Sequence, residues 1–171
     1  MPNKKSRYLI QNRLVDVLAA IQVMGSSTWD SRPIRDWKLF LDDKPQSAES
    51  WESLFAEHPE FFGARDHQSG QRHYFLLLRR AYPKTIEPDT GCEISSEQLE
   101  KLRVSGEYRN ARLARRALTP EQVAALVSTA VELEIRAAAL EDRARWWIPL
   151  AAALLAFAGA ILGSLVKVAF E

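Results

Sequence analysis

Three histidines have the broadest chemistry of any residues in this sequence, because imidazole binds metal ions and transfers protons near neutral pH. They are His58, His67 and His73. His58 precedes a proline, a position typical of turn packing, whereas His67 and His73 flank a polar stretch and could approach each other across a turn. No cysteine or carboxylate stands at the spacing of a recognised metal site, so we expect no metal ion and no other cofactor.

Other catalytic signatures are missing from the sequence. It contains no phosphate-binding glycine loop, no GxSxG motif and no HExxH motif. The single cysteine, Cys92, lies in EPDTGCE, where acidic neighbours would raise the pKa of its thiol. Glu49, Glu52, Glu57 and Glu60 have the spacing of a solvated acidic face. We therefore expect no catalytic residues and no enzymatic activity.

Two groups of basic side chains are the candidates for docking a partner. The first is Arg72, Arg79, Arg80 and Lys84; the second, which we expect on one side of a helix, is Arg109, Arg112, Arg115 and Arg116. Basic residues unmixed with acids fit a docking surface for an acidic protein. Two alternatives remain open: the first group could pair with the acidic residues around position 50, and the second could contact anionic lipid.

Nucleic acid is not the partner we expect. The chain of 171 residues carries 23 basic and 22 acidic residues, so it is no general polyanion binder. The helix predicted over 48–58 contains Glu49, Glu52 and Glu57 and no lysine or arginine, which disfavours insertion into a DNA groove. A membrane-tethered DNA-binding regulator is nevertheless kept as the alternative function.

The elements that would position these residues begin with three helices. Apolar residues recur at helical spacing over 7–25, and further helices are predicted over 31–43 and 48–58. Two apolar runs around DHQSG then predict a β-hairpin. Three helices followed by a hairpin is the element order of a winged-helix domain, which we place over residues 1–84.

Residues 85–94 contain proline, glycine and acids and are predicted to be a linker. A helical hairpin or stalk is expected over 95–145, with capping boxes at Ser95 and Thr119. The second helix carries a heptad seam for self-association, formed by Val123, Leu126, Ala130, Leu133, Ala137 and Leu140. The seam could pack against a second copy or against residues 95–118 of the same chain.

The uncharged run from Trp146 to Val166 has the length of one membrane crossing, about 20 residues. We therefore predict a transmembrane anchor over 146–170, whose Gly159 and Gly163 form a GxxxG self-association motif. Arg143 and Arg145 before it place the N-terminus in the cytoplasm. The predicted fold class is mainly α with a small β-hairpin: a winged-helix-like domain, a helical stalk and a single C-terminal transmembrane helix.

Four blocks, RYLIQNRLVDVLAAIQVMG, EHPEFF, RRAYPK and RWWIPLAA, resemble those of a group of small bacterial proteins with a C-terminal membrane helix. Some members are called N-carbamoyl-L-amino acid hydrolase. That name implies a dinuclear metal enzyme, but the resemblance carries no catalytic residue to this chain. The resulting expectation is a tail-anchored bacterial inner-membrane protein with a cytoplasmic adaptor or scaffold module. Its expected partners are the lipid bilayer, an unidentified cytoplasmic protein and further copies of itself.

Overall fold

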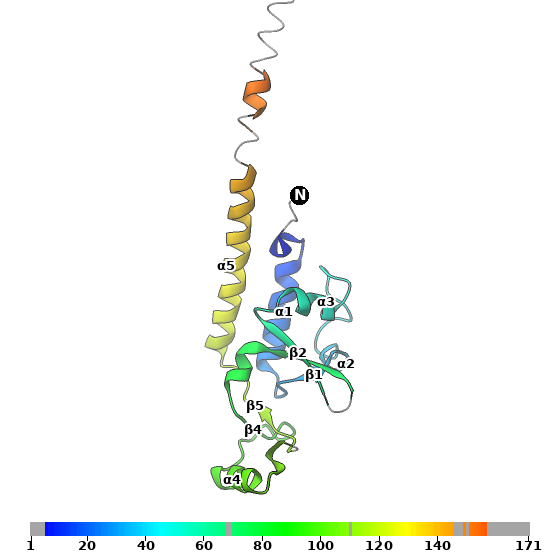
Figure 1. The fold of residues 1–171 in the computed structure, drawn as a ribbon, viewed down its shortest axis with the longest axis vertical. Helices are drawn as coiled ribbons and strands as arrows, with labels where there is room; N and C mark the ends of the chain where they lie inside the picture. Colours follow the sequence, from blue (N-terminus) through cyan, green and yellow to red (C-terminus); the bar gives the residue numbers. More distant parts are fainter. Residues whose placement is uncertain (1–5, 68–69, 110, 146–148, 150, 157–171) are drawn as a thin grey trace, which may run out of the picture.

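Two helices far apart in the sequence, α1 (Arg13–Ser26) and α5 (Pro120–Arg145), lie side by side in the computed structural model (Figure 1). The structure describes residues 6–67, 70–109, 111–145, 149 and 151–156. The two helices run in opposite directions, and Leu118, just before α5, donates its backbone N–H to the carbonyl of Gly25 near the end of α1, 2.9 Å away. The 3-10 helix η1 (Arg7–Leu9) extends the contact along α5.

Two shorter helices follow α1. Strand β1 (Arg32–Pro33) leads directly into α2 (Ile34–Trp37), and α3 (Trp51–Glu57) begins after a long connection. Helix α3 begins at a capping box in which Ser50 and Ser53 exchange side-chain to backbone hydrogen bonds. The helix predicted over 31–43 is therefore shorter than expected, because its first residues pair as a strand with β3.

A three-stranded antiparallel sheet packs on these helices, with the strand order β1-β3-β2. Its hairpin is formed by β2 (Phe62–Asp66) and β3 (Arg72–Leu76), and the 3-10 helix η2 (Leu77–Ala81) follows. The indole of Trp37 donates a hydrogen bond to the carbonyl of Tyr74, 3.0 Å away, and so joins α2 to the central strand.

The rest of the chain before α5 forms a second, two-stranded sheet from β4 (Lys84–Ile86) and β5 (Ala114–Arg115). Between these strands in the sequence lie helix α4 (Ser96–Val104) and the 3-10 helix η3 (Glu107–Arg109), at the opposite end of the molecule from the C-terminal end of α5 (Figure 1). The second basic group was expected on a helix, but Ala114 and Arg115 are extended because they pair with β4.

One apolar core joins α1, α5 and the three-stranded sheet. Its fully or nearly fully buried members include Ile21, Trp37, Leu54, Leu76 and Ala130. Aromatic rings fill the space between α3 and the hairpin, with the centroids of Phe55 and Phe62 4.7 Å apart. The core thus fixes the hairpin relative to α1, which positions the functional residues discussed below.

The predicted fold class is wrong. Within the described residues the chain has two small antiparallel sheets where a mainly α fold with one small hairpin was expected. The expected helical hairpin over 95–145 is likewise replaced by α4, η3, β5 and α5. The short strands β1, β4 and β5 were missed because their sequences carry no alternation of apolar and polar residues.

The predicted transmembrane helix is also corrected. Among the described residues, no helix has both the length and the apolar character needed to cross a membrane. The predictions that rested on this helix, a tail-anchored single-pass protein of the bacterial inner membrane with its N-terminus in the cytoplasm, are corrected with it. Residues 146–148, 150 and 157–170 of the predicted anchor, including Gly159 and Gly163, lie outside the described residues.

Candidate functional site

A cleft of about 740 Å³ lies between the end of the hairpin and the two-stranded sheet. We call it the hairpin cleft. Its walls come from residues 29–31, residues 65–67 with His73, and Lys84 with residues 111–113. These segments are brought together by the sheet register, in which Arg65 lies opposite His73, and by the pairing of Lys84 with Arg115.

Basic groups dominate the hairpin cleft. Arg65, Lys84 and Arg112 line it together with His67 and His73. Of the lining carboxylates, Asp30 is already occupied, because its Oδ2 lies 2.6 Å from Nη1 of Arg115 in a pair that is largely buried. The remaining lining carboxylate is Asp66, so the wall presents an excess of positive charge.

The pKa of Lys84 is lowered mainly by burial of its ammonium group. The guanidinium groups of Arg65 and Arg115 lower this pKa further against the opposing effect of Asp30. In addition, the Nε–H of Arg65 is shielded from solvent and has no hydrogen-bond partner within the described part of the chain. A ligand with negative charge would relieve the mutual repulsion of these groups.

Arg112 connects the cleft to an aromatic side chain. Its guanidinium carbon lies 4.7 Å from the ring centroid of Trp29, and Arg32 approaches the same ring at 4.7 Å. Arg112 also forms an exposed ion pair with Asp89, 3.2 Å away. Such exposed pairs contribute at most about 1 kcal/mol, so Arg112 can exchange Asp89 for a carboxylate of a ligand.

Arg79 was predicted to dock a partner, but the structure places it in the interior with 1% of its surface exposed. Its guanidinium donates hydrogen bonds to backbone carbonyls at the end of α1 and beside β5, those of Met24, Ser27, Trp29, Arg115 and Arg116. Carbonyls at a helix end lack partners inside the helix and attract cations. Arg79 therefore holds α1 and β5 together and is unavailable to a partner.

The other predicted docking residues are dispersed. Arg72 lies exposed on β3, and the guanidinium of Arg80 lies over the ring of Phe75, 4.8 Å from its centroid. Arg109 ends η3, and Arg116 lies over the ring of Tyr82, 4.1 Å from its centroid. Of the eight docking candidates that the sequence indicates, Lys84 and Arg112 line the hairpin cleft.

Sequence reasoning missed Arg65, Trp29 and Asp30 as members of this site. Arg65 stands alone near the end of an apolar run, and Trp29, Asp30, Lys84 and Arg112 reach the cleft from segments outside its hairpin. The position of His67 and His73 on either side of the hairpin turn was the usable signal. Their rings do approach each other, with centroids 4.5 Å apart.

The residues of the heptad seam other than Leu140 are buried or partly buried within the same chain, on a helix that packs against α1. Ala130 is fully buried and Ala137 nearly so, while Val123, Leu126 and Leu133 are partly buried against the core. Leu140, in contrast, is 65% exposed. The partner inside the chain is α1, whereas the two alternatives left open by the sequence were a second copy and residues 95–118. Self-association through this helix stays a prediction. The contact between copies would involve the part of α5 around the exposed Leu140.

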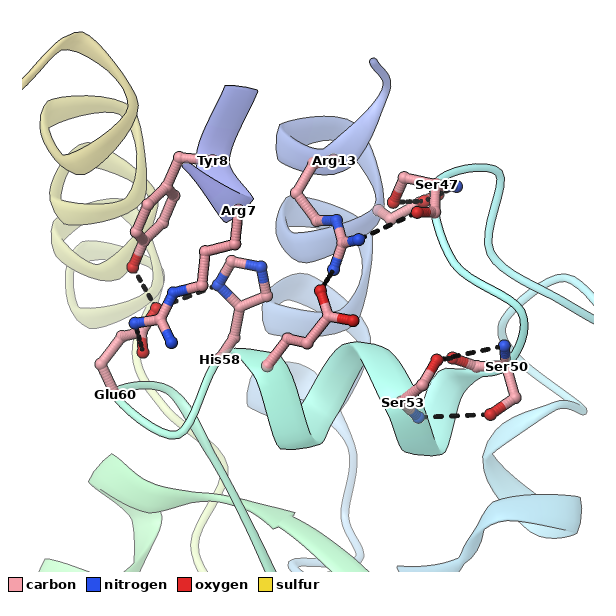
Figure 2. A network of polar contacts seen from close by, with 10 residues as sticks. Arg7, Tyr8, Arg13, Ser47, Ser50, Ser53, His58 and Glu60 are labelled. Carbon is pink, nitrogen blue, oxygen red and sulfur yellow. Dashed lines mark hydrogen bonds and ion pairs between the residues drawn. The ribbon is translucent and has the colours of Figure 1, made fainter. Parts of the chain in front are cut away.

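A second polar cluster connects the N-terminal turn to the start of β2 (Figure 2). The carboxylate of Glu60 accepts hydrogen bonds from Arg7 and Tyr8 and contacts Nδ1 of His58, 2.9 Å away. Burial, followed by the contact with Glu60, raises the pKa of Tyr8 to about 12, and burial lowers the pKa of His58. The His58 ring is fully buried, so a substrate in solution does not reach it.

The same region anchors the connection before α3 to α1. Arg13 forms an ion pair with Glu57 and donates to the carbonyl of Ser47, 2.9 Å away. The carboxylate of Asp16 accepts hydrogen bonds from the backbone N–H of Gln46 and from both the N–H and the hydroxyl of Ser47. Figure 2 shows Arg13 of α1 joined to Ser47, and the bonds of Arg13 and Asp16 to this connection indicate a structural role for the cluster.

Metal binding finds no support in the geometry that the structure describes. No group of three or more His, Cys, Asp or Glu side chains in that part of the chain is arranged to hold a metal ion. Comparison with known proteins adds no assignment: no protein-family model, no curated protein and no solved structure matches the chain.

Proposed function

We propose that this protein is a binding module whose hairpin cleft docks an acidic segment of a partner protein. The observation that carries the proposal is the convergence of Arg65, Lys84 and Arg112 on one cleft in which Asp30 is neutralised by Arg115. A volume of about 740 Å³ accommodates several side chains of a peptide. Carboxylates that enter the cleft would gain charge-assisted hydrogen bonds from guanidinium groups.

The geometry favours an acidic peptide over nucleic acid. Binding of single strands uses free aromatic faces on which bases stack. The aromatic side chain of the cleft, Trp29, already has the guanidinium groups of Arg32 and Arg112 over its ring. Helix α3 contributes Glu52 and Glu57 and no basic residue, so it is a poor surface for phosphates.

A titration of the full chain with a fluorescent hexa-aspartate peptide tests the proposal. We expect saturable binding that weakens as salt is added. Replacing Lys84 or Arg112 by Gln should weaken binding by about threefold to fivefold each, as for the loss of one partly exposed ion pair.

The chain offers a matched control for Arg112. Arg136 on α5 is exposed to the same degree, 73% against 71%, and forms an ion pair of the same length, 3.2 Å, with Glu132. Arg136→Gln should leave the affinity unchanged. Equal weakening by Arg136→Gln and Arg112→Gln would show a nonspecific charge effect and refute the proposal. Tighter binding of duplex DNA than of peptide, lost in Lys84→Gln and Arg112→Gln, would favour a DNA-binding regulator instead.

A further inference from the structure

The two histidines of the hairpin cleft form a stacked pair. Their ring planes are inclined by only 11° at a centroid distance of 4.5 Å. His73 is held on β3, opposite Arg65 of β2 and Pro33 of β1. His67 closes the hairpin turn, where its backbone N–H donates to the carbonyl of Gln71, 2.9 Å away. Two imidazolium rings held this close repel each other, so full protonation of the pair is costly in the free protein.

The charged groups around the pair are mostly cationic. Arg65 stands beside the rings, and Lys84 and Arg112 line the same cleft from the two-stranded sheet and the segment before β5. Burial lowers the pKa of His73, and His67 and Arg65 lower it further. A hydrogen bond with the backbone of Ser31 and the carboxylate of Asp36 on α2 oppose this effect.

Of the carboxylates around the pair, Asp36 and Asp30 already form ion pairs. Asp36 on α2 raises the pKa of His73, but it also pairs with Arg35, 3.2 Å away. Asp30 is held by Arg115, which leaves Asp66 as the remaining carboxylate of the cleft wall. The free cleft therefore has little negative charge to stabilise a doubly protonated histidine pair, and an incoming acidic segment would supply it.

We propose that His67 and His73 are anion-binding residues of the hairpin cleft, which take up protons when an acidic segment docks. This inference rests on the proposed function, because it requires a carboxylate ligand in the cleft. Each carboxylate placed near the rings stabilises the imidazolium form and raises its pKa. By linkage, a complex that binds more protons than the free protein becomes tighter as the pH falls.

The pH window follows from the ordinary pKa values of the groups involved. An unperturbed imidazole has a pKa of about 6.5 and an aspartate side chain a pKa of about 4. The ligand therefore stays charged while the histidines gain protons. Affinity should rise by up to about tenfold per pH unit for each proton taken up. The effect should be confined to the range between about pH 7.5 and 5.5.

The test is a titration of the full chain with the hexa-aspartate peptide at pH 8.0, 7.0, 6.0 and 5.5 at constant ionic strength. Wild-type protein and the double variant His67→Gln, His73→Gln are compared. We expect the wild-type affinity to rise about fivefold or more from pH 8.0 to 6.0. The affinity of the double variant should change by less than about twofold between pH 8.0 and 6.0. Imidazole proton resonances in NMR should show raised pKa values for both histidines in the complex.

The outcomes separate the two proposals. Binding at pH 8.0 with the same pH dependence in wild type and double variant would overturn the role of the histidines and leave the proposed function standing. Histidine pKa values unchanged by saturating peptide would do the same. Failure of the wild-type protein to bind the peptide at any of these pH values would overturn both the proposed function and this inference.

Discussion

The guanidinium Nη1 of Arg79 donates a hydrogen bond to the backbone carbonyl of Met24, 2.9 Å away, in the last turn of α1. The same side chain bonds the carbonyls of Arg115 and Arg116 beside β5. Arg79 thus joins the end of the first long helix to the segment that leads into the last one. Burial lowers the pKa of this guanidinium to about 10, which leaves it charged at neutral pH.

Replacing Arg79 by Lys should destabilise the protein. A lysine keeps the charge, but its single ammonium group cannot reach all the carbonyls that the planar guanidinium bonds. We expect a loss of about 2–4 kcal/mol in the free energy of unfolding, because several buried carbonyls lose their donors. Urea denaturation of the full chain measures this loss. Arg80→Lys, on the exposed neighbour, should change stability by less than about 0.5 kcal/mol, and a similar loss there would contradict the assignment.

Gly63 is required by its cross-strand neighbour Phe75. A Cβ atom at Gly63 would lie 2.5 Å from Cε2 and 2.7 Å from Cζ of the Phe75 ring. Gly63→Ala should therefore cost about 1–3 kcal/mol through overpacking. In a protein that already carries Phe75→Leu, adding Gly63→Ala should lower the free energy of unfolding by less than it does in the wild type. If the costs of the two changes simply add, the ring contact is not the cause.

The α5 seam can be tested at two of its positions. Ala130 is fully buried against the core, whereas Leu140 is exposed. Ala130→Leu should destabilise the chain by about 1–3 kcal/mol by overpacking, and Leu140→Ser should leave stability unchanged within about 0.5 kcal/mol.

Self-association is tested separately by measuring the molar mass of the wild type and of Leu140→Ser in solution by light scattering. If copies associate around Leu140, Leu140→Ser should lower the oligomer fraction. An oligomer fraction that is equal in wild type and Leu140→Ser would contradict a role for this part of α5.

Acidification should destabilise the region around His58. Burial lowers the pKa of His58 below its ordinary value of 6.5, so the unfolded chain takes up a proton before the folded one does. This contribution to stability is therefore present above about pH 6.5 and is lost as the pH falls below it, with a slope of at most about 1.4 kcal/mol per pH unit. Burial raises the pKa of Glu60, but hydrogen bonds from Tyr8 and His58 outweigh it and lower that pKa, which adds to the loss at lower pH.

Urea denaturation at pH 7.5 and 5.5 measures this dependence. His58→Asn should lower stability at pH 7.5 and reduce the difference between the two pH values. His73→Asn is the matched control, because His73 is only partly buried and its removal should affect the difference less. A larger effect of His73→Asn would show that His58 is not the group responsible.

Short-range features of the fold were predictable from the sequence. The apolar spacing over 7–25 predicted the helix that the structure shows as α1, and the two runs around DHQSG predicted the β2–β3 hairpin. The capping box of Ser95 and Gln98 at the start of α4 is confirmed, and Thr119 and Gln122 exchange the predicted hydrogen bonds at the start of α5. These features depend on residues three or four positions apart, or on alternation along one segment.

The basic residues show where such reasoning stops. Arg79 and Arg80 are adjacent and identical in type, yet one is buried among carbonyls and the other lies over the ring of Phe75 at the surface. Arg115 was expected on a helix with Arg112 and instead bonds Asp30 from an extended strand, 85 positions apart in the sequence. No local pattern distinguishes these environments.

By itself, the sequence determined where α4 and α5 begin and that α1 and α5 carry a repeating apolar face. Helix capping and helix periodicity are local interactions, so both can be read from neighbouring residues. Tertiary structure alone decided that α1 covers the seam of α5, that Arg79 joins α1 to β5, and that the hairpin cleft gathers Arg65, Lys84 and Arg112. The physical reason is that burial and ion pairing depend on which distant segments meet, and the short pairings of β1 and β4 that bring them together leave almost no trace in sequence pattern.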